Sequence, residues 1–439
     1  MGVRFRVARG PLATSFGASL LIQGLNVLTG IVLARTLGPE GRGELAAILL
    51  WPAALATVGN LGVADATTFY AARRRAALGT LAGSAAVVWL AQSLLLVSVA
   101  AAVVSIVFSG YPADVRPLAL AYVAYIPLFL ATVYAMNLLQ GLHQFRDFQF
   151  IRLLLIALTA AGLTAAWASA SLGVGAAVLV YLGASSVTAV AAVILLGIAG
   201  ATPLRVDRRV VSDLLRYGVR SHPSTVATML NERADQLVIS LFLAPAKLGL
   251  YVVAVTLTSL TSLVGSSIAL VAMPRLAREV DRETRQRMAA RYVRLTLVGS
   301  LLLTVPLLLI TPRLLEILFG TAFNAAAGVA RILLVAAVLL TTGRLLAAVL
   351  KAVDRPLRAG LADALALVVT VAGLALLLPA FGLVGAGLAS LAAYAAATGW
   401  MAREAARALD VPVRGLVFAH ACRSGIAVSA PSTAGGSGS

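Results

Sequence analysis

Long apolar stretches recur along the chain from Pro11 to Met401, and only short polar segments separate them. A helix that crosses the hydrocarbon core of a membrane needs about 20 predominantly apolar residues. By this criterion the sequence predicts twelve membrane-spanning helices, at residues 12–36, 44–70, 77–108, 116–141, 148–171, 174–200, 213–243, 248–274, 290–311, 325–350, 357–379 and 383–402. The expected fold class is therefore an all-α integral membrane protein.

The composition fits the same conclusion. Of the 439 residues, 60% are hydrophobic and 12% are charged, whereas a soluble domain has about 25% charged residues. The net charge of +18 would suggest nucleic-acid binding in a soluble protein. Here most Lys and Arg residues fall in the breaks on one side of the predicted membrane, so we expect no nucleic-acid partner.

This charge asymmetry also predicts the orientation. If the N-terminus is cytoplasmic, the inside breaks contain 27 Lys and Arg residues and the outside breaks contain five. Basic residues concentrate on the cytoplasmic side of multi-pass proteins. We therefore expect a multi-pass protein of a bacterial cytoplasmic membrane, with both termini inside the cell.

The chain contains a weak internal repeat. The segment LGPEGRGEL (37–45) aligns with LAPAKLGLY (243–251) at a shift of 206 residues. Each repeat holds six predicted spans, and an even number of spans gives two parallel repeats. We expect a six-helix N-terminal lobe at residues 1–205, a six-helix C-terminal lobe at 206–408, a central cavity between them, and a disordered cytoplasmic tail at 409–439.

The seventh predicted span carries three charges at its centre: Glu232, Arg233 and Asp235. Each central charge costs about 2.5–3.5 kcal/mol on insertion scales, so these side chains must face protein or water. Helical geometry places Glu232, Asp235 and Gln236 on one face, with Arg233 on the flank. We expect the two carboxylates to neutralise Arg233 when no substrate is bound. The alternative is a charge-paired packing contact with no role in transport.

The first predicted span has a matching polar face that includes Gln23 and Asn26, and the repeat shift places Asn26 on Glu232. Two equivalent helices with polar faces predict a hydrophilic cavity, although small polar residues also serve as packing contacts between membrane helices. Three other charges, Arg331, Arg344 and Asp65, fall inside or beside predicted spans. The two arginines have the alternative of extending to lipid headgroups.

The sequence offers little for catalysis. Its three histidines, His143, His222 and His420, lack metal-ligand spacing, Cys422 is the single cysteine, and no phosphate-binding loop occurs. We expect no cofactor, no metal and no catalytic residue.

Two segments resemble a known family: SFGASLLIQGLNVLTGIVLARTLGPEGRGELAAI and LNERADQLVISLFLAPAKLGLYVVA. They are similar to the polysaccharide transport family, the O-antigen-type flippases of the multidrug, oligosaccharidyl-lipid and polysaccharide exporter superfamily. The resemblance implies a V-shaped pair of six-helix lobes. It also implies that the protein flips polyprenyl-pyrophosphate-linked oligosaccharide from the inner to the outer leaflet by alternating access. The family's central Arg and acidic positions fall on Arg233 and Asp235, with Glu232 beside them.

These arguments give a set of expected site residues and partners. For substrate binding we assign Arg233, Arg331, Arg344, Asn26, Gln23 and Gln236. For ion coupling we assign Glu232, Asp235 and Asp65. The expected partners are the lipid-linked oligosaccharide, membrane lipids, H⁺ or Na⁺, and a polymerase or other glycan assembly protein. The alternatives are a multidrug or lipid II flippase of the same superfamily and a polytopic glycosyltransferase, although we expect no enzyme.

The charge asymmetry gives a prediction about topology. A reporter enzyme that is active only outside the cytoplasm should be silent when fused after Pro412 and active when inserted near Asn324. Reporter activity measured in intact cells checks this, and the reverse pattern would contradict the orientation.

Overall fold

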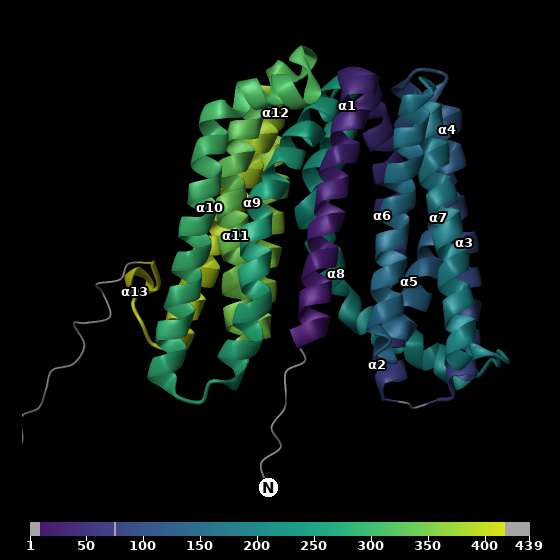
Figure 1. Cartoon of the computed structure of the whole chain (residues 1–439), viewed down its shortest axis with the longest axis horizontal. Coiled ribbons are helices and arrows are strands. Elements are labelled where there is room, and N and C mark those ends of the chain that lie inside the picture. The colour runs from purple at the N-terminus through teal and green to yellow at the C-terminus, as the bar shows by residue number, and fades with distance from the viewer. Residues whose placement is uncertain (1–8, 74–75, 418–439) are drawn as a thin grey trace, which may run out of the picture.

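The computed structural model describes residues 9–73 and 76–417, and the regular elements in this part of the chain are helices (Figure 1). They are α1 (Arg9–Gly59), α2 (Val63–Ala72), α3 (Leu78–Val107), η1 (Phe108–Gly110), α4 (Val115–Tyr122), α5 (Tyr125–Gly141), α6 (Phe145–Ala168), α7 (Val174–Leu196), η2 (Gly197–Ala201), α8 (Arg208–Phe242), α9 (Pro245–Arg278), α10 (Arg282–Phe319), η3 (Thr321–Ala326), α11 (Ala327–Ala352), α12 (Pro356–Leu409) and α13 (Val413–Val417).

The predicted spans are helical. Within the described residues, nine helical segments are long and apolar enough to cross a membrane. Two of these, α1 and α12, each contain two predicted spans that meet at a glycine, Gly38 or Gly382, with a φ of 64° or 55°. Glycine adopts this left-handed conformation at little cost, so the chain can turn there. The remaining predicted span is α8, whose central charges lower its hydropathy.

Two predicted spans are interrupted. Residues 60–62 separate α1 from α2, and residues 123–124 separate α4 from α5. Pro127 explains the second break because it has no N–H to donate to the carbonyl of Val123. The N–H of Ile126 bonds to that carbonyl instead, at 3.0 Å. The break positions two tyrosines, Tyr122 and Tyr125, that become important below.

The helices form two lobes (Figure 1). Helices α9 to α12 gather on one side of the molecule and α3 to α7 on the other, while α1 and α8 run between them. The protein is thus an all-α, multi-pass membrane protein of two six-helix repeats around a central cavity, as predicted.

The lobes meet closely near Gly38, and we call this the Gly38 end of the molecule. A methyl group on Gly43 would lie 1.7 Å from the carbonyl oxygen of Pro245, and one on Gly249 would lie 1.9 Å from that of Pro39. The repeat shift of 206 relates Gly43 to Gly249 and Pro39 to Pro245. The two repeats therefore make one reciprocal contact of backbone against backbone, and it uses the Pro and Gly positions that are identical in the two aligned repeats.

An arginine strengthens this closure. The Nε of Arg35, on the first half of α1, donates to the carbonyl of Leu318 at 2.9 Å, and its guanidinium also contacts the carbonyl of Ile317. Both carbonyls belong to the last turn of α10, where backbone oxygens lack partners within the helix. A cation is stabilised at such a helix end.

Helix α8 contacts both lobes. Near its start, a methyl group on Gly218 would lie 2.9 Å from the carbonyl carbon of Gly62, at the junction between α1 and α2. Farther along, the side-chain amide of Asn231 donates to the carbonyl of Asp363 on α12 at 2.8 Å. Pro223 lies between these two contacts. Helix α8 begins just after the predicted lobe boundary at 205/206, and its first turns pack against the N-terminal lobe.

The start of the predicted tail is ordered. Helix α12 ends at Leu409, and Asp410 pairs with Arg282 at 2.7 Å. Leu416 in α13 is buried in the cluster formed by the C-terminal helices. The expectation of disorder is therefore wrong for residues 409–417, because Leu416 has apolar surface to bury. The rest of the predicted tail, with Cys422, lies outside the described residues.

The reciprocal contact gives a prediction about stability. Gly43→Ala and Gly249→Ala should each lower the free energy of unfolding by about 1–3 kcal/mol, because a methyl group cannot fit against a backbone carbonyl without separating the lobes. The thermal unfolding midpoint of the purified protein in detergent checks this. Gly183→Ala is the matched control, since a methyl group there meets nothing within 4 Å. Equal midpoints for all three variants would contradict the closure.

Candidate functional site

A central cavity lies between the lobes and consists of three neighbouring chambers with shared lining residues. The N chamber, about 420 Å³, is lined mainly by α1 and α4 to α7, and the C chamber, about 410 Å³, by α8, α9, α11 and α12. A middle chamber of about 250 Å³ lies along α1, α8 and α9. Arg233 and Gln236 line all three chambers. The three chambers are therefore neighbours that share a wall on α8.

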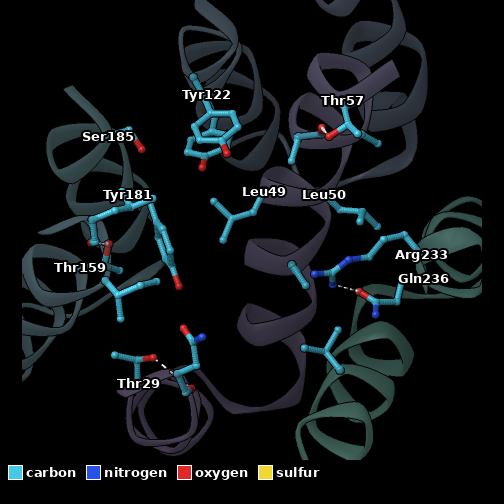
Figure 2. A pocket seen from close by; sticks show the side chains of 18 of the residues that line it. Thr29, Leu49, Leu50, Thr57, Tyr122, Thr159, Tyr181, Ser185, Arg233 and Gln236 are labelled. Atoms are coloured by element: carbon cyan, nitrogen blue, oxygen red, sulfur yellow. Dashed lines mark hydrogen bonds between the residues drawn. The ribbon is translucent and has the colours of Figure 1, made fainter. Parts of the chain in front are cut away.

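Hydroxyl groups and aromatic rings dominate the N chamber. Figure 2 shows its labelled lining residues: Thr29, Leu49, Leu50, Thr57, Tyr122, Thr159, Tyr181, Ser185, Arg233 and Gln236. The guanidinium of Arg233 faces the chamber from α8, opposite Tyr181 on α7 (Figure 2). None of the residues that line the N chamber is acidic. Its charged groups are therefore cations alone.

The C chamber contains paired charges. The carboxylate of Glu232 accepts from the guanidinium of Arg344 at 2.7 Å, and both side chains are about half exposed to the cavity. Asp235 is buried, and its carboxylate accepts from the hydroxyl of Tyr251 at 2.5 Å and from that of Ser390 at 3.4 Å. Hydrogen bonds to an ionised carboxylate offset part of the cost of burying it.

These partners correct one expectation. Arg233 donates to the side-chain oxygen of Gln236 at 3.3 Å, and within the described residues no carboxylate lies within ion-pair distance of it. The direct pairing of Glu232 and Asp235 with Arg233 is therefore absent among the described residues, although the charge of Arg233 still acts on Asp235 through space. Adjacent residues on a helix do not face each other, so Glu232 points to Arg344, while Tyr251 and Ser390 hold Asp235. Arg233 is therefore available to a ligand.

The structure brings most of the predicted site residues together. Besides Arg233, Gln236, Glu232, Asp235 and Arg344, the residues Gln23 and Asn26 of α1 line the cavity. The matching polar faces of α1 and α8 thus meet across the middle chamber, as their repeat positions indicated.

Arg331 and Asp65 lie outside these three chambers. The Nε of Arg331 donates to the carbonyl of Leu308 at 3.3 Å. Pro312 is four residues farther along α10 and has no N–H for that carbonyl, so Arg331 supplies the missing donor. Asp65 is exposed in the first turn of α2, where the positive end of the helix dipole stabilises a carboxylate. Both charges have local structural explanations.

Sequence reasoning missed Arg42, which lines the N and middle chambers. The predicted spans 12–36 and 44–70 place Arg42 in a break outside the membrane, as one of the five basic residues there, but α1 resumes after Gly38 and carries it into the cavity. Its Nε is buried without a hydrogen-bond partner among the described residues. One signal in the sequence indicates its depth: the repeat shift of 206 aligns Arg42 with Leu248, an apolar residue at the start of the predicted span 248–274.

The described residues contain no cluster of three or more His, Cys, Asp and Glu side chains that could hold a metal ion. The groups available in the cavity are instead guanidinium, carboxylate, amide and hydroxyl groups. Such a set can bind an anion with polar substituents and can exchange a proton or a small cation at its carboxylates.

Comparison with known proteins places the chain in a family. The sequence profile described as "Polysaccharide biosynthesis protein" matches residues 12–280. The chain belongs to this family. A curated relative, the probable low-salt glycan biosynthesis flippase Agl15 of Haloferax volcanii, is 24% identical over 190 residues, which cover 42% of this chain. The matched region spans only 40% of the length of that relative.

Solved structures share the fold. An inward closed conformation of the lipid II flippase MurJ matches with a TM-score of 0.75 and 11% identity, over 92% of this chain and 89% of that one. An inward-facing multidrug resistance transporter of the MATE family matches with a TM-score of 0.70 and 16% identity, over 88% of this chain and 96% of that one. The chain therefore shares the fold of these two transporters.

The cavity gives a prediction about solvent access. In a Cys422→Ser background, Asn26→Cys and Met229→Cys should react with a polar maleimide because both positions line the cavity. Leu241→Cys should not react, since Leu241 is exposed on the outside of the apolar helix bundle, where lipid covers it. Labelling of the protein in native membranes, read by mass shift, checks this. Equal labelling of all three variants would contradict a water-filled cavity.

Proposed function

We propose that this protein is a transporter that moves a polyprenyl-pyrophosphate-linked oligosaccharide from the inner to the outer leaflet of a bacterial cytoplasmic membrane. The observation that supports this best is Arg233, which lines all three chambers and has no carboxylate partner. A guanidinium stays protonated even when it is partly desolvated, and its planar donors match two phosphate oxygens at once. The family and the glycan flippase relative favour the same substrate class.

Alternating access is the mechanism that suits this architecture. The lobes are fastened at the Gly38 end by the reciprocal glycine contact and by Arg35. We take the Gly38 end to face the outer side of the membrane, as the positive-inside pattern predicts. Separating the lobes at the Gly38 end and joining them at the other end would release the glycan outside.

The carboxylates of the C chamber provide a route for coupling. Glu232 is held by Arg344, and Asp235 by two hydroxyl groups. A proton or a sodium ion at either carboxylate changes the charge beside Arg233 and so changes the affinity for an anion. An ion gradient can therefore drive the exchange, and no nucleotide, cofactor or catalytic residue is required. A polymerase or another glycan assembly protein would receive the product.

A multidrug exporter is the second candidate, because the MATE transporter shares the fold. The chamber charges argue against cationic drugs: Arg42 and Arg233 face a space without a lining carboxylate, and like charges in a low-dielectric cavity repel. An anionic headgroup fits the same space.

Flipping in vesicles tests the proposal. In proteoliposomes that carry undecaprenyl-diphosphoryl-N-acetylglucosamine, an external galactosyltransferase adds labelled galactose to outer-leaflet lipid alone. Arg233→Ala should slow the approach to full labelling by roughly ten- to hundredfold, because a hydrogen bond to a charged group contributes about 1.5–3 kcal/mol. Arg233→Lys should lose less, since it keeps the charge without the two-pronged geometry. Asp235→Asn should remove the dependence on an imposed ion gradient.

Arg331→Gln is the matched control because it removes an arginine of a membrane helix that lies outside the chambers. This variant should flip at the wild-type rate once folded protein is quantified. If Arg233→Ala also flips at that rate, the cavity charges serve packing only and the proposed function is wrong.

A further inference from the structure

The N chamber holds three tyrosines that neither phosphate binding nor ion coupling uses. The rings of Tyr122 and Tyr125 are stacked, with centroids 5.1 Å apart and an interplanar angle of 10°. The α4–α5 break at Pro127 brings them together, because Tyr122 ends one helix and Tyr125 begins the next. Tyr181 on α7 lines the same chamber, and its hydroxyl points into it (Figure 2).

The chamber wall is rich in groups that suit sugar hydroxyls. Among the described residues, none of the three tyrosine hydroxyls has a hydrogen-bond partner in the protein. Thr57 and Thr159 donate to carbonyls of their own helices at 2.8 Å and so keep free lone pairs facing the chamber. Ser185 adds a further hydroxyl. A ring with many hydroxyl groups can donate to the threonines and accept from the tyrosines.

Arg42 stands where this wall meets the middle chamber, as does Arg233. The Nε of Arg42 is buried without a partner among the described residues. Neither Arg42 nor Arg233 forms an ion pair among the described residues, and no carboxylate lines the N or middle chamber, so an anion in this space would supply the missing counter-charge to both guanidinium groups. In the C chamber, Arg344 is already paired with Glu232. The anion therefore belongs on the N-chamber side of α8.

We infer that the N chamber is a glycan-binding subsite: Arg42 and Arg233 together hold the diphosphate, and the first sugar lies against Tyr125 and Tyr181, with the buried ring of Tyr122 supporting Tyr125 from behind. The apolar C–H face of a pyranose packs on an aromatic face, while its edge hydroxyls meet the tyrosine and threonine hydroxyls. The two sides of α8 thus have different roles: the N chamber binds the substrate, and the carboxylates of the C chamber exchange the ion. This inference rests on the proposed function and extends it to the orientation of the substrate.

Equilibrium binding tests it with short, soluble probes. The purified protein in nanodiscs is titrated with citronellyl diphosphate and with citronellyl diphosphates that carry N-acetylglucosamine, galactose or glucose. Wild type should bind at least one sugar-bearing probe about tenfold more tightly than the bare diphosphate, the ratio that corresponds to about 1.4 kcal/mol. Tyr181→Leu should abolish this difference and leave the affinity for the bare diphosphate unchanged. Arg42→Gln should weaken all the probes by a similar factor.

Tyr394→Leu is the matched control, because Tyr394 lines the C chamber. It should keep the sugar-dependent difference. Loss of the difference in Tyr394→Leu, or equal weakening of the bare and sugar-bearing probes by Tyr181→Leu in folded protein, would overturn the inference. No difference for any sugar in wild type would also overturn it.

The binding assay and the flipping assay distinguish failure of the N-chamber subsite from failure of the proposed function. If the sugar-dependent difference is absent but Arg233-dependent flipping persists, the N-chamber subsite is wrong and the proposed function stands. If the difference is present but the protein does not flip the lipid in vesicles, the subsite stands and the proposed transport is wrong.

Discussion

The cost of keeping ionised side chains away from hydrocarbon decides much of this structure. Helix α8 carries Glu232, Arg233 and Asp235 at membrane depth, and a helix with such charges cannot face lipid on that side. It lies instead between the lobes, where the cavity solvates Arg233 and partners from α9, α11 and α12 hold the carboxylates. The position of α8 then fixes the cavity on both of its sides.

Closure of the Gly38 end depends on the absence of side chains. Gly43 and Gly249 let two helices approach until backbone meets backbone, and a larger residue at either position would keep the lobes apart. Around this contact, apolar side chains of both lobes are buried in one cluster, among them Leu45 and Ile48 of α1 and Leu248 of α9. Separating the lobes at this end therefore exposes apolar surface, and an outward-open state must bury comparable surface elsewhere.

The sequence predicted the helices well because hydropathy and length determine which segments span a membrane. It also predicted that α1 and α8 present matching polar faces. It could not predict charge partners: Arg344 reaches Glu232 from 112 residues away, and the hydroxyl of Tyr251 holds Asp235. The role of Arg42 was missed because depth in the membrane depends on where α1 resumes after Gly38. Nor does the sequence indicate that Arg331 donates a hydrogen bond to the carbonyl of Leu308, which Pro312 leaves without its helical partner.

The reciprocal contact at the Gly38 end also bears on how such a chain can arise. Each repeat carries both halves of the contact, a proline carbonyl and a glycine, so two copies of one six-helix repeat related by a two-fold axis would make the same closure. A self-complementary homodimer of that kind has two identical walls. Joining the copies in one gene frees the two walls to diverge, so that this chain has tyrosines on one wall and carboxylates on the other.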